Sequence, residues 1–200
     1  MMGLPAHYGD PEEPDARSTR LRVIAEAVAD VAEQATCSAA YKKESCVTLW
    51  PGASLDLGVL LVTQAYEESR LAKNVHEGQC RAYECDPIRV GFSGEIRHRA
   101  RSLWQIHHIG PIEEEWDHMV GSDYESTRFA AWAATKILSR GYRNCGTLSG
   151  AISQYAGVGT CGWSQSKKRG KLVLKLRDRA RNIEQKWLRE QGLDRSASNN

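Results

Sequence analysis

The sequence predicts a single, mainly α-helical domain, and three observations lead to this prediction. The chain has 200 residues, which is enough for one ordinary domain with a sizeable core. Its hydrophobic fraction of 41% and charged fraction of 26% are close to globular averages, which argues against a disordered chain or a coiled coil. Apolar residues recur at helical spacing in several segments, and no region is rich in strand patterns. We therefore expect one core and one functional site.

The first predicted helix follows a short N-terminal tail. Residues 1 to 16 hold three prolines among acidic residues and few apolar ones, so we expect a flexible tail there. A helix is expected from Ser18 to about Thr36, because apolar residues such as Leu21 and Val28 recur on one face and Ser18 can cap its start.

A second helix and a long excursion follow. The helix is expected from about Ser54 to Arg70, after the turn signal of Pro51 and Gly52. Residues 71 to 101 carry glycines, a proline, two cysteines and many charges, which is typical of a long, partly irregular excursion with room for short strands. Excursions of this length are often functional.

Three further helices complete the predicted domain. The first of them should end before Gly141, because glycine commonly follows the last turn of a helix. The last is basic between residues 167 and 181, which predicts a strongly positive surface. The domain should occupy residues 17 to 190, with a flexible tail at 191 to 200. The three helices are expected at Tyr124 to Arg140, Thr147 to Tyr155 and Gln165 to Arg189.

Six cysteines form an even set, which indicates disulfides and an oxidising site of action. Reduced, partly buried thiols are the alternative. The connectivity does not follow from sequence alone, but short separations make local closure easy and favour Cys80 with Cys85 and Cys145 with Cys161. The remaining candidates are Cys37 and Cys46.

Two adjacent glutamates at the end of the second predicted helix differ in their surroundings. At about 100° per residue, Glu67 falls on a polar stripe. Glu68 lies in line with the apolar Leu57 and Leu61, where desolvation favours the protonated carboxylic acid. Glycosidic cleavage needs such an acid, because the leaving oxygen must receive a proton as the bond breaks. The pattern therefore selects Glu68 as a candidate acid, against the alternative of an ordinary surface glutamate.

Three short segments resemble motifs of soluble lytic transglycosylases and the related goose-type lysozymes, in the same order. The stretch Tyr66-Glu67-Glu68-Ser69-Arg70 closes a predicted helix, as the Glu-Ser motif does in that family. The stretch Ala100-Arg101-Ser102-Leu103-Trp104-Gln105 resembles the family's Gly-Leu-Met-Gln segment, and Gln154-Tyr155-Ala156-Gly157 is similar to its Asn-Tyr-Asn-Ala-Gly segment. The resemblance implies a lysozyme-like fold that cleaves the β-1,4 bond between N-acetylmuramic acid and N-acetylglucosamine in peptidoglycan.

The resemblance also implies roles for single residues. Glu68 would be the only essential carboxylate and would act as acid and base. Ser69 would help to orient substrate or water, Gln105 would line the floor of the cleft, and Tyr155 would place its hydroxyl near Glu68. Trp104, which adjoins the second motif, could offer a flat face to a sugar ring, although core packing is its alternative role.

The number of carboxylates determines the expected product. A lone glutamate implies a lytic transglycosylase that leaves 1,6-anhydro-muramyl ends and needs no cofactor and no metal. Ser102 and Ala156 depart from the family's glycine and asparagine, which leaves details of sugar binding open. The alternative is a hydrolysing lysozyme with a second carboxylate from residues 77 to 95. The candidates there are Glu77, Glu84, Asp86 and Glu95.

Other functional classes are weaker alternatives. The basic segment 167 to 181 could bind phosphates, but no aromatic residues are interleaved for base stacking, so we expect no nucleic acid partner. A peptidoglycan-binding module without activity would not need a glutamate on an apolar face. Zinc is a further alternative, and its candidate ligands are His76, Cys80, Cys85 and His98.

The expected partners are peptidoglycan glycan strands and, for a bacteriophage protein, components of the virion. No membrane span is expected, because the longest apolar run, Leu57 to Val62, is broken by Gly58 and is too short. The first residues lack the pattern of a secretory signal. We therefore expect action at the periplasm or cell wall by a protein that is carried in a virion or released at lysis. A bacterial enzyme exported by a specialised system, or a chain from which a signal has been removed, is the alternative.

Overall fold

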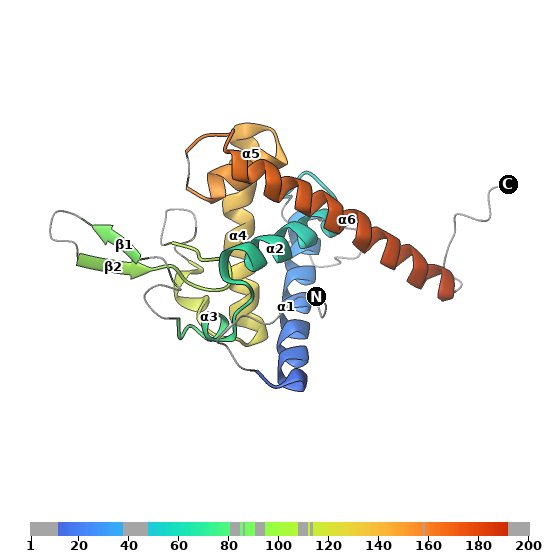
Figure 1. Cartoon of the computed structure of the whole chain (residues 1–200), viewed down its shortest axis with the longest axis horizontal. Coiled ribbons are helices and arrows are strands. Elements are labelled where there is room, and N and C mark those ends of the chain that lie inside the picture. The colour runs from blue at the N-terminus through green and yellow to red at the C-terminus, as the bar shows by residue number, and fades with distance from the viewer. Residues whose placement is uncertain are drawn as a thin grey trace.

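Helix α4, Tyr124–Cys145, runs through the middle of the molecule, and α1 and α5 pack against it (Figure 1). The structure is a computed structural model. Between residues 86 and 99 it describes the backbone of two strands and no side chains. The described residues are 12–37, 48–80, 85, 87–90, 95–107, 112, 114–157 and 159–191.

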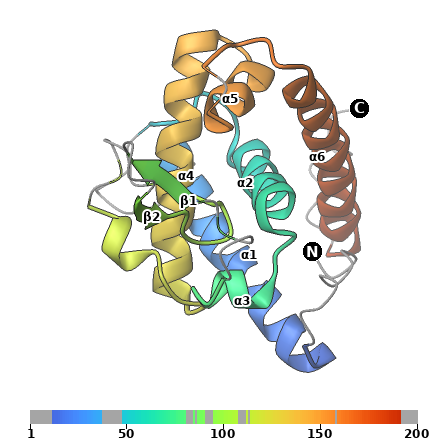
Figure 2. The same ribbon diagram turned by 60° about the vertical axis from the view of Figure 1, so that its left-hand side comes forward.

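The chain is mainly helical, as the sequence predicts, with one small antiparallel hairpin of strands β1 and β2. Helix α2 packs on α1, and α6 lies along α2 and against α5. Helix α2 is therefore enclosed between α1 and α6 (Figure 2). In the described part of the chain, no helix is both long enough and apolar enough to cross a membrane. The remaining elements are α1 (Pro14–Thr36), α2 (Ser54–Ser69), α3 (Lys73–His76), β1 (Pro87–Val90), β2 (Glu95–Arg99), the 3-10 helix η2 (Trp116–His118), α5 (Leu148–Tyr155) and α6 (Ser164–Glu190).

The first helix begins earlier than the sequence predicts. Helix α1 starts at Pro14, inside the stretch expected to be a flexible tail. Proline suits the first turn of a helix because its missing N–H would have no partner there. Glu12 is also held in place, because its carboxylate forms a two-pronged ion pair with the buried Arg20, at 2.8 and 2.7 Å. Residues 1–11 and 192–200, the outer parts of the two expected tails, lie outside the described residues.

Helix α4 extends past the glycine that was expected to end it. Gly141 is buried in the helix, and a Cβ there would lie 2.9 Å from the Cβ of Gln154 and 3.0 Å from the backbone oxygen of Ala151. This glycine therefore allows α4 and α5 to approach closely. The helix ends instead at Gly146, whose φ of 67° is the left-handed conformation that favours glycine.

The predicted excursion contains short regular elements. It holds α3 and the β1–β2 hairpin, whose register pairs Pro87 with Arg99 and Val90 with Glu95. The excursion ends in a tight turn in which Arg101 pairs with Ile106 as an isolated bridge. This turn carries the second of the three motif segments against the core.

Candidate active site

Three segments that are far apart in sequence meet at the C-terminal end of α2. Tyr155, at the end of α5, donates a hydrogen bond from its hydroxyl to the backbone oxygen of Trp104 at 2.5 Å. The indole Nε1 of Trp104 donates to the backbone oxygen of Leu61 on α2 at 2.9 Å. Glu68 follows on the same face of α2, two turns beyond Leu61. The three motif segments are thus joined by hydrogen bonds or by helix geometry into one site.

The backbone just after Glu68 is strained. Arg70 and Leu71 both have φ of 55°, in the left-handed region that non-glycine residues rarely adopt. The buried Ser69 bridges this bend: its Oγ donates to the oxygen of Ala65 at 2.8 Å and accepts from the N–H of Leu71 at 3.2 Å. Arg20 of α1 also donates to the oxygen of Leu71 at 3.0 Å. Strained backbone of this kind clusters at functional sites, where the surrounding structure must hold it.

These contacts correct one expected role. Both hydrogen bonds of the Ser69 hydroxyl are made to backbone groups of its own helix end. The side chain therefore shapes the bend after Glu68, and in this conformation its hydroxyl is not directed at a substrate.

Glu68 forms a close ion pair with Arg169 of α6. Its Oε1 lies 2.5 Å from Nη1 of Arg169, and the same guanidinium reaches Oε1 of the buried Gln64 at 3.5 Å. The ring of Trp163 lies below this guanidinium, 5.9 Å from its central carbon, within the range of a cation–π contact. Arg169 is therefore fixed over the carboxylate by three residues of α2 and of the start of α6.

The helical pattern predicts that Glu67 is more exposed than Glu68, but the two side chains are equally exposed. Their side chains are 21% and 22% exposed. They differ in their partners. Glu67 lies 3.5 Å from Arg70 and 3.8 Å from Arg169, so both of its contacts are looser than the pair between Glu68 and Arg169.

The phenol of Tyr155 stays protonated at neutral pH. Burial raises the pKa of Tyr155 well above its usual value of 10.0, the nearby carboxylate of Glu68 raises it further, and the charge of Arg169 offsets part of this effect. The hydroxyl itself is bonded to the backbone oxygen of Trp104, so the expected role of Tyr155 in orienting Glu68 stays a prediction. Tyr155 is thus a fixed hydrogen-bond donor at the site.

Trp104 lies in the core. Its side chain is 0% exposed, and its one N–H is bonded to Leu61. A wholly buried indole offers no face to a sugar ring, so the expected contact with substrate is replaced by core packing beneath the site.

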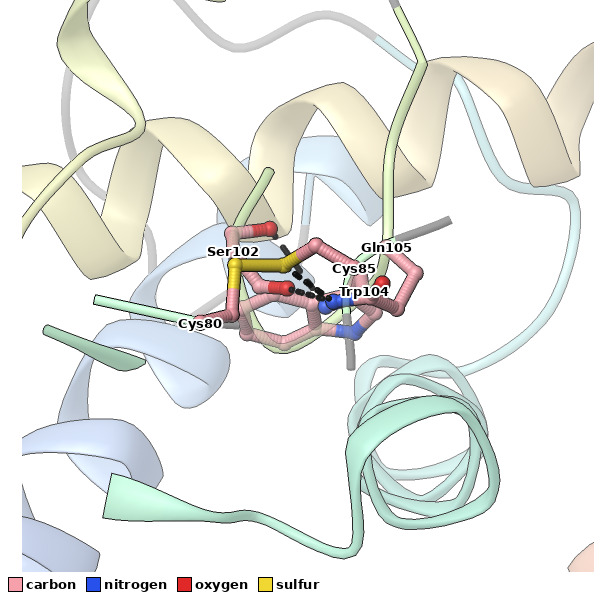
Figure 3. The surroundings of a disulfide bond; sticks show 5 residues. All are labelled: Cys80, Cys85, Ser102, Trp104 and Gln105. Atoms are coloured by element: carbon pink, nitrogen blue, oxygen red, sulfur yellow. Dashed lines mark hydrogen bonds between the residues drawn. A yellow bond between two sulfur atoms is a disulfide. The ribbon is translucent and has the colours of Figure 1, made fainter. Parts of the chain in front are cut away.

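Gln105 is held by its own turn and by the neighbouring disulfide. Its Nε2 donates to the oxygen of Ser102 at 3.1 Å and lies 3.5 Å from the sulfur of Cys85 (Figure 3). Ser102 and Gln105 have φ of 63° and 49°. These φ values lie in the left-handed region that favours glycine, so the turn is strained at both residues. In this conformation the amide of Gln105 supports the turn.

Two predicted disulfides are confirmed. Cys80 pairs with Cys85 beside the turn (Figure 3), and Cys145 pairs with Cys161, which ties the end of α4 to the segment before α6. Cys37 is also disulfide-bonded, whereas Cys46 lies outside the described residues.

The alternative zinc site is not formed. Cys80 and Cys85 are bonded to each other, and the described residues contain no group of three or more metal-binding side chains. His76 is buried in a hydrogen bond with Thr127, and the side chain of His98 is not described.

Among the candidate second carboxylates, the structure describes only the side chain of Glu77, which lies 3.8 Å from Lys73 on α3. Glu84 and Asp86 lie outside the described residues, and for Glu95 the structure describes the backbone of β2 alone.

Sequence reasoning missed Arg169 as part of the site. It was grouped with the basic residues of 167 to 181, and no local pattern links it to a glutamate 101 positions away. A cavity of about 610 Å³ was also missed. It lies between α1, α2 and α6 and is lined by residues such as Val28, Val62 and Leu176, away from Glu68.

Comparisons were made with known protein families, with curated proteins and with solved structures. None of the three gives a match to this chain.

Proposed function

We propose that the protein cleaves the glycan strands of peptidoglycan as a lytic transglycosylase, with Glu68 as acid and base. The observation that carries the proposal is the meeting of Glu68, the Ser102–Gln105 turn and Tyr155 at one place in a mainly helical fold. These segments resemble three motifs of that enzyme family, and a chance likeness of short motifs would not require them to meet. The strained bend after Glu68 supports the same location.

The chemistry needs one group that first donates and then accepts a proton. Protonated Glu68 gives its proton to the glycosidic oxygen as the bond to the anomeric carbon breaks. The resulting carboxylate then accepts the proton of the sugar's 6-hydroxyl, whose oxygen bonds to the anomeric carbon and closes a 1,6-anhydro ring. No water is consumed, and Glu68 ends protonated, ready for another cycle. Tyr155 would hold the Ser102–Gln105 turn in place through the hydrogen bond from its hydroxyl to the backbone oxygen of Trp104.

Arg169 competes with the glycan for the carboxylate of Glu68. Its Nη1 lies 2.5 Å from Oε1 of Glu68. The same carboxylate must approach the glycosidic oxygen to donate a proton, so binding of the glycan must displace the guanidinium.

The proposed place of action is the periplasm or cell wall, where the substrate lies. The two described disulfides suit an oxidising compartment. Delivery in a virion or release at lysis belongs to the same proposal, with virion components as partners.

The test compares Glu68→Gln with Glu67→Gln, a matched pair because the two side chains are neighbours of equal exposure. We expect Glu68→Gln to clear purified cell walls on the order of a hundredfold more slowly, because an amide cannot donate the proton. Glu67→Gln should keep most of the activity. Similar losses in both variants, with unchanged thermal unfolding, would remove Glu68 from its role.

The product distinguishes the transglycosylase from the lysozyme alternative. Mass spectrometry of digested peptidoglycan should show muramyl ends lighter by one water. Reducing ends as the main product would instead establish a hydrolase and direct attention to the carboxylates of residues 77 to 95. Binding to walls without any release of sugar would leave only the binding-module alternative.

A further inference from the structure

The C-terminal half of α6 projects beyond the rest of the molecule (Figure 1). Its first half packs on α2 and α5 and contains its buried residues Ser166, Gly170 and Val173. From residue 182 to residue 190 every position is exposed except Leu188, which is half-buried. An isolated helix end gains little from packing, so its surface chemistry is the feature to explain.

One side of this projecting half is apolar. Leu176, Ala180, Ile183 and Trp187 recur at intervals of three and four residues, which places them on one stripe of the helix. Ile183 is 61% exposed and Trp187 is 54% exposed, and both are among the large apolar side chains that the described surface leaves open to solvent. Exposed apolar side chains that line up in this way indicate a binding surface.

The apolar stripe continues into the cavity between α1, α2 and α6. Leu176, Ala180 and Ile183 line this cavity of about 610 Å³, opposite Val28 of α1 and Val62 of α2. The stripe and the cavity together form one apolar surface that begins under α6 and extends to Trp187 at its free end.

Cations border this surface. The segment Ser164–Glu190 holds ten lysines and arginines against three acidic residues. Arg179 lies at the rim of the cavity, and Lys186 lies beside Trp187 with Glu190 3.8 Å away. In the described part of the chain, six cations of α6 are exposed and make no ion pair. They are Lys167, Lys168, Lys171, Lys175, Arg179 and Arg189.

We propose that the projecting half of α6 docks on the surface of an anionic lipid membrane. A bilayer supplies an apolar layer for Ile183 and Trp187 and negative headgroups for the neighbouring cations, at the same depth. Tryptophan is the residue that membrane interfaces favour, because its ring is apolar and its N–H is polar. Nucleic acid would use only the cations, and a second copy of the chain would bring a like-charged helix to the same surface.

This surface is independent of the proposed cleavage site. Glu68 contacts the first turns of α6, whereas Ile183 and Trp187 lie at its far end. The two proposals can therefore fail separately, because Glu68→Gln should bind vesicles as the unchanged protein does.

The test measures co-sedimentation of the full chain with vesicles of phosphatidylglycerol and phosphatidylcholine in equal parts, against vesicles of phosphatidylcholine alone. We expect on the order of tenfold or stronger preference for the anionic vesicles. The double change Ile183→Ser with Trp187→Ser removes the apolar contact. The double change Lys175→Glu with Arg179→Glu reverses the charge. Each should weaken binding on the order of tenfold or more.

The matched control is Arg140→Glu with Arg143→Glu, two exposed cations of α4 whose reversal changes the net charge by the same amount. This variant should bind nearly as well as the unchanged protein, and circular dichroism should show the same helix content in all variants. Equal weakening in the control would overturn the proposal, since net charge alone would then explain binding.

Two further outcomes would also overturn it. One is absence of vesicle binding together with salt-dependent binding to duplex DNA. The other is absence of vesicle binding together with a dimer, seen by light scattering, that is lost in the Ile183→Ser, Trp187→Ser variant. In contrast, brominated lipids could quench the tryptophan fluorescence of the unchanged protein more strongly than that of Trp187→Phe. This result would place Trp187 itself in the bilayer and support the proposal.

Discussion

Acid should destabilise the fold through His76, a buried histidine at the end of α3. Its side chain is 2% exposed, and its Nε2 lies 2.8 Å from the hydroxyl of Thr127. That hydroxyl has one hydrogen and donates it to the oxygen of Asp123 at 2.6 Å, so Nε2 must carry the proton and donate to Thr127. Nδ1 has no hydrogen-bond partner among the described residues. Burial, aided by the charge of Arg20, lowers the pKa of His76 from 6.5 to about 4.

The size of the effect follows from proton linkage. The pKa is lower in the folded state, so the unfolded state binds more protons as the pH falls below about 6.5. The free energy of unfolding therefore decreases between pH 6.5 and pH 4, and the contribution of His76 levels off below the folded pKa. With these two pKa values, His76 should lower the free energy of unfolding by about 2 kcal/mol between pH 7 and pH 5, and by about 3 kcal/mol between pH 7 and pH 4.

The assay is equilibrium unfolding in urea at pH 7 and pH 5, with disulfides intact, for the unchanged protein and His76→Gln. Glutamine can donate to Thr127 through its amide but does not titrate. All other groups are common to both proteins, so their contributions cancel in the difference. The unchanged protein should lose about 2 kcal/mol more than His76→Gln on going to pH 5. Parallel losses in the two proteins would refute the buried, neutral state of His76.

Three more predictions concern the site and its supports. Arg169→Gln should lower the wall concentration needed for half-maximal lysis, because no guanidinium then has to leave Glu68 before the glycan binds. Arg177→Gln, which removes the contacts with Asp56 and Asp178, should leave that concentration unchanged, and lysis rates measured against wall concentration check both. Replacing both Cys145 and Cys161 by serine should lower the free energy of unfolding by about 3 kcal/mol. Replacing both Cys80 and Cys85 by serine should lower it by a smaller amount, because that pair closes a shorter loop. Equal losses in urea unfolding would contradict this reason. Ser102→Val should destabilise by about 1 to 3 kcal/mol and Ser102→Gly by much less, because φ of 63° strains a branched side chain; thermal unfolding of the pair checks it.

The helices and the two disulfides could be predicted from sequence because their causes are local. Apolar residues such as Leu57 and Leu61 recur along one helix, and Cys80 and Cys85 are separated by five positions. Short separations of this kind restrict the chain to a few geometries, whatever the rest of the fold does.

The candidate site could be predicted only in part, because its geometry depends on distant contacts. The face of α2 that carries Glu68 follows from helical periodicity, but the guanidinium of Arg169 over it does not. Trp104 was expected near a sugar, and the deciding fact, its bond to Leu61 across 43 positions, exists only in the fold. Similarly, nothing in the sequence indicates that the Ser69 hydroxyl would be used by the bend that follows it.

At Gly141 the requirements of the helix and of the fold conflict. Alanine would favour the helical state by about 1 kcal/mol over glycine within α4. The same methyl group would collide with the backbone of α5, whose last residue is Tyr155. The position is thus locally frustrated, and directed evolution for thermal stability should not accept alanine there unless α5 moves. Helix propensity and the packing that places Tyr155 therefore favour different residues at position 141.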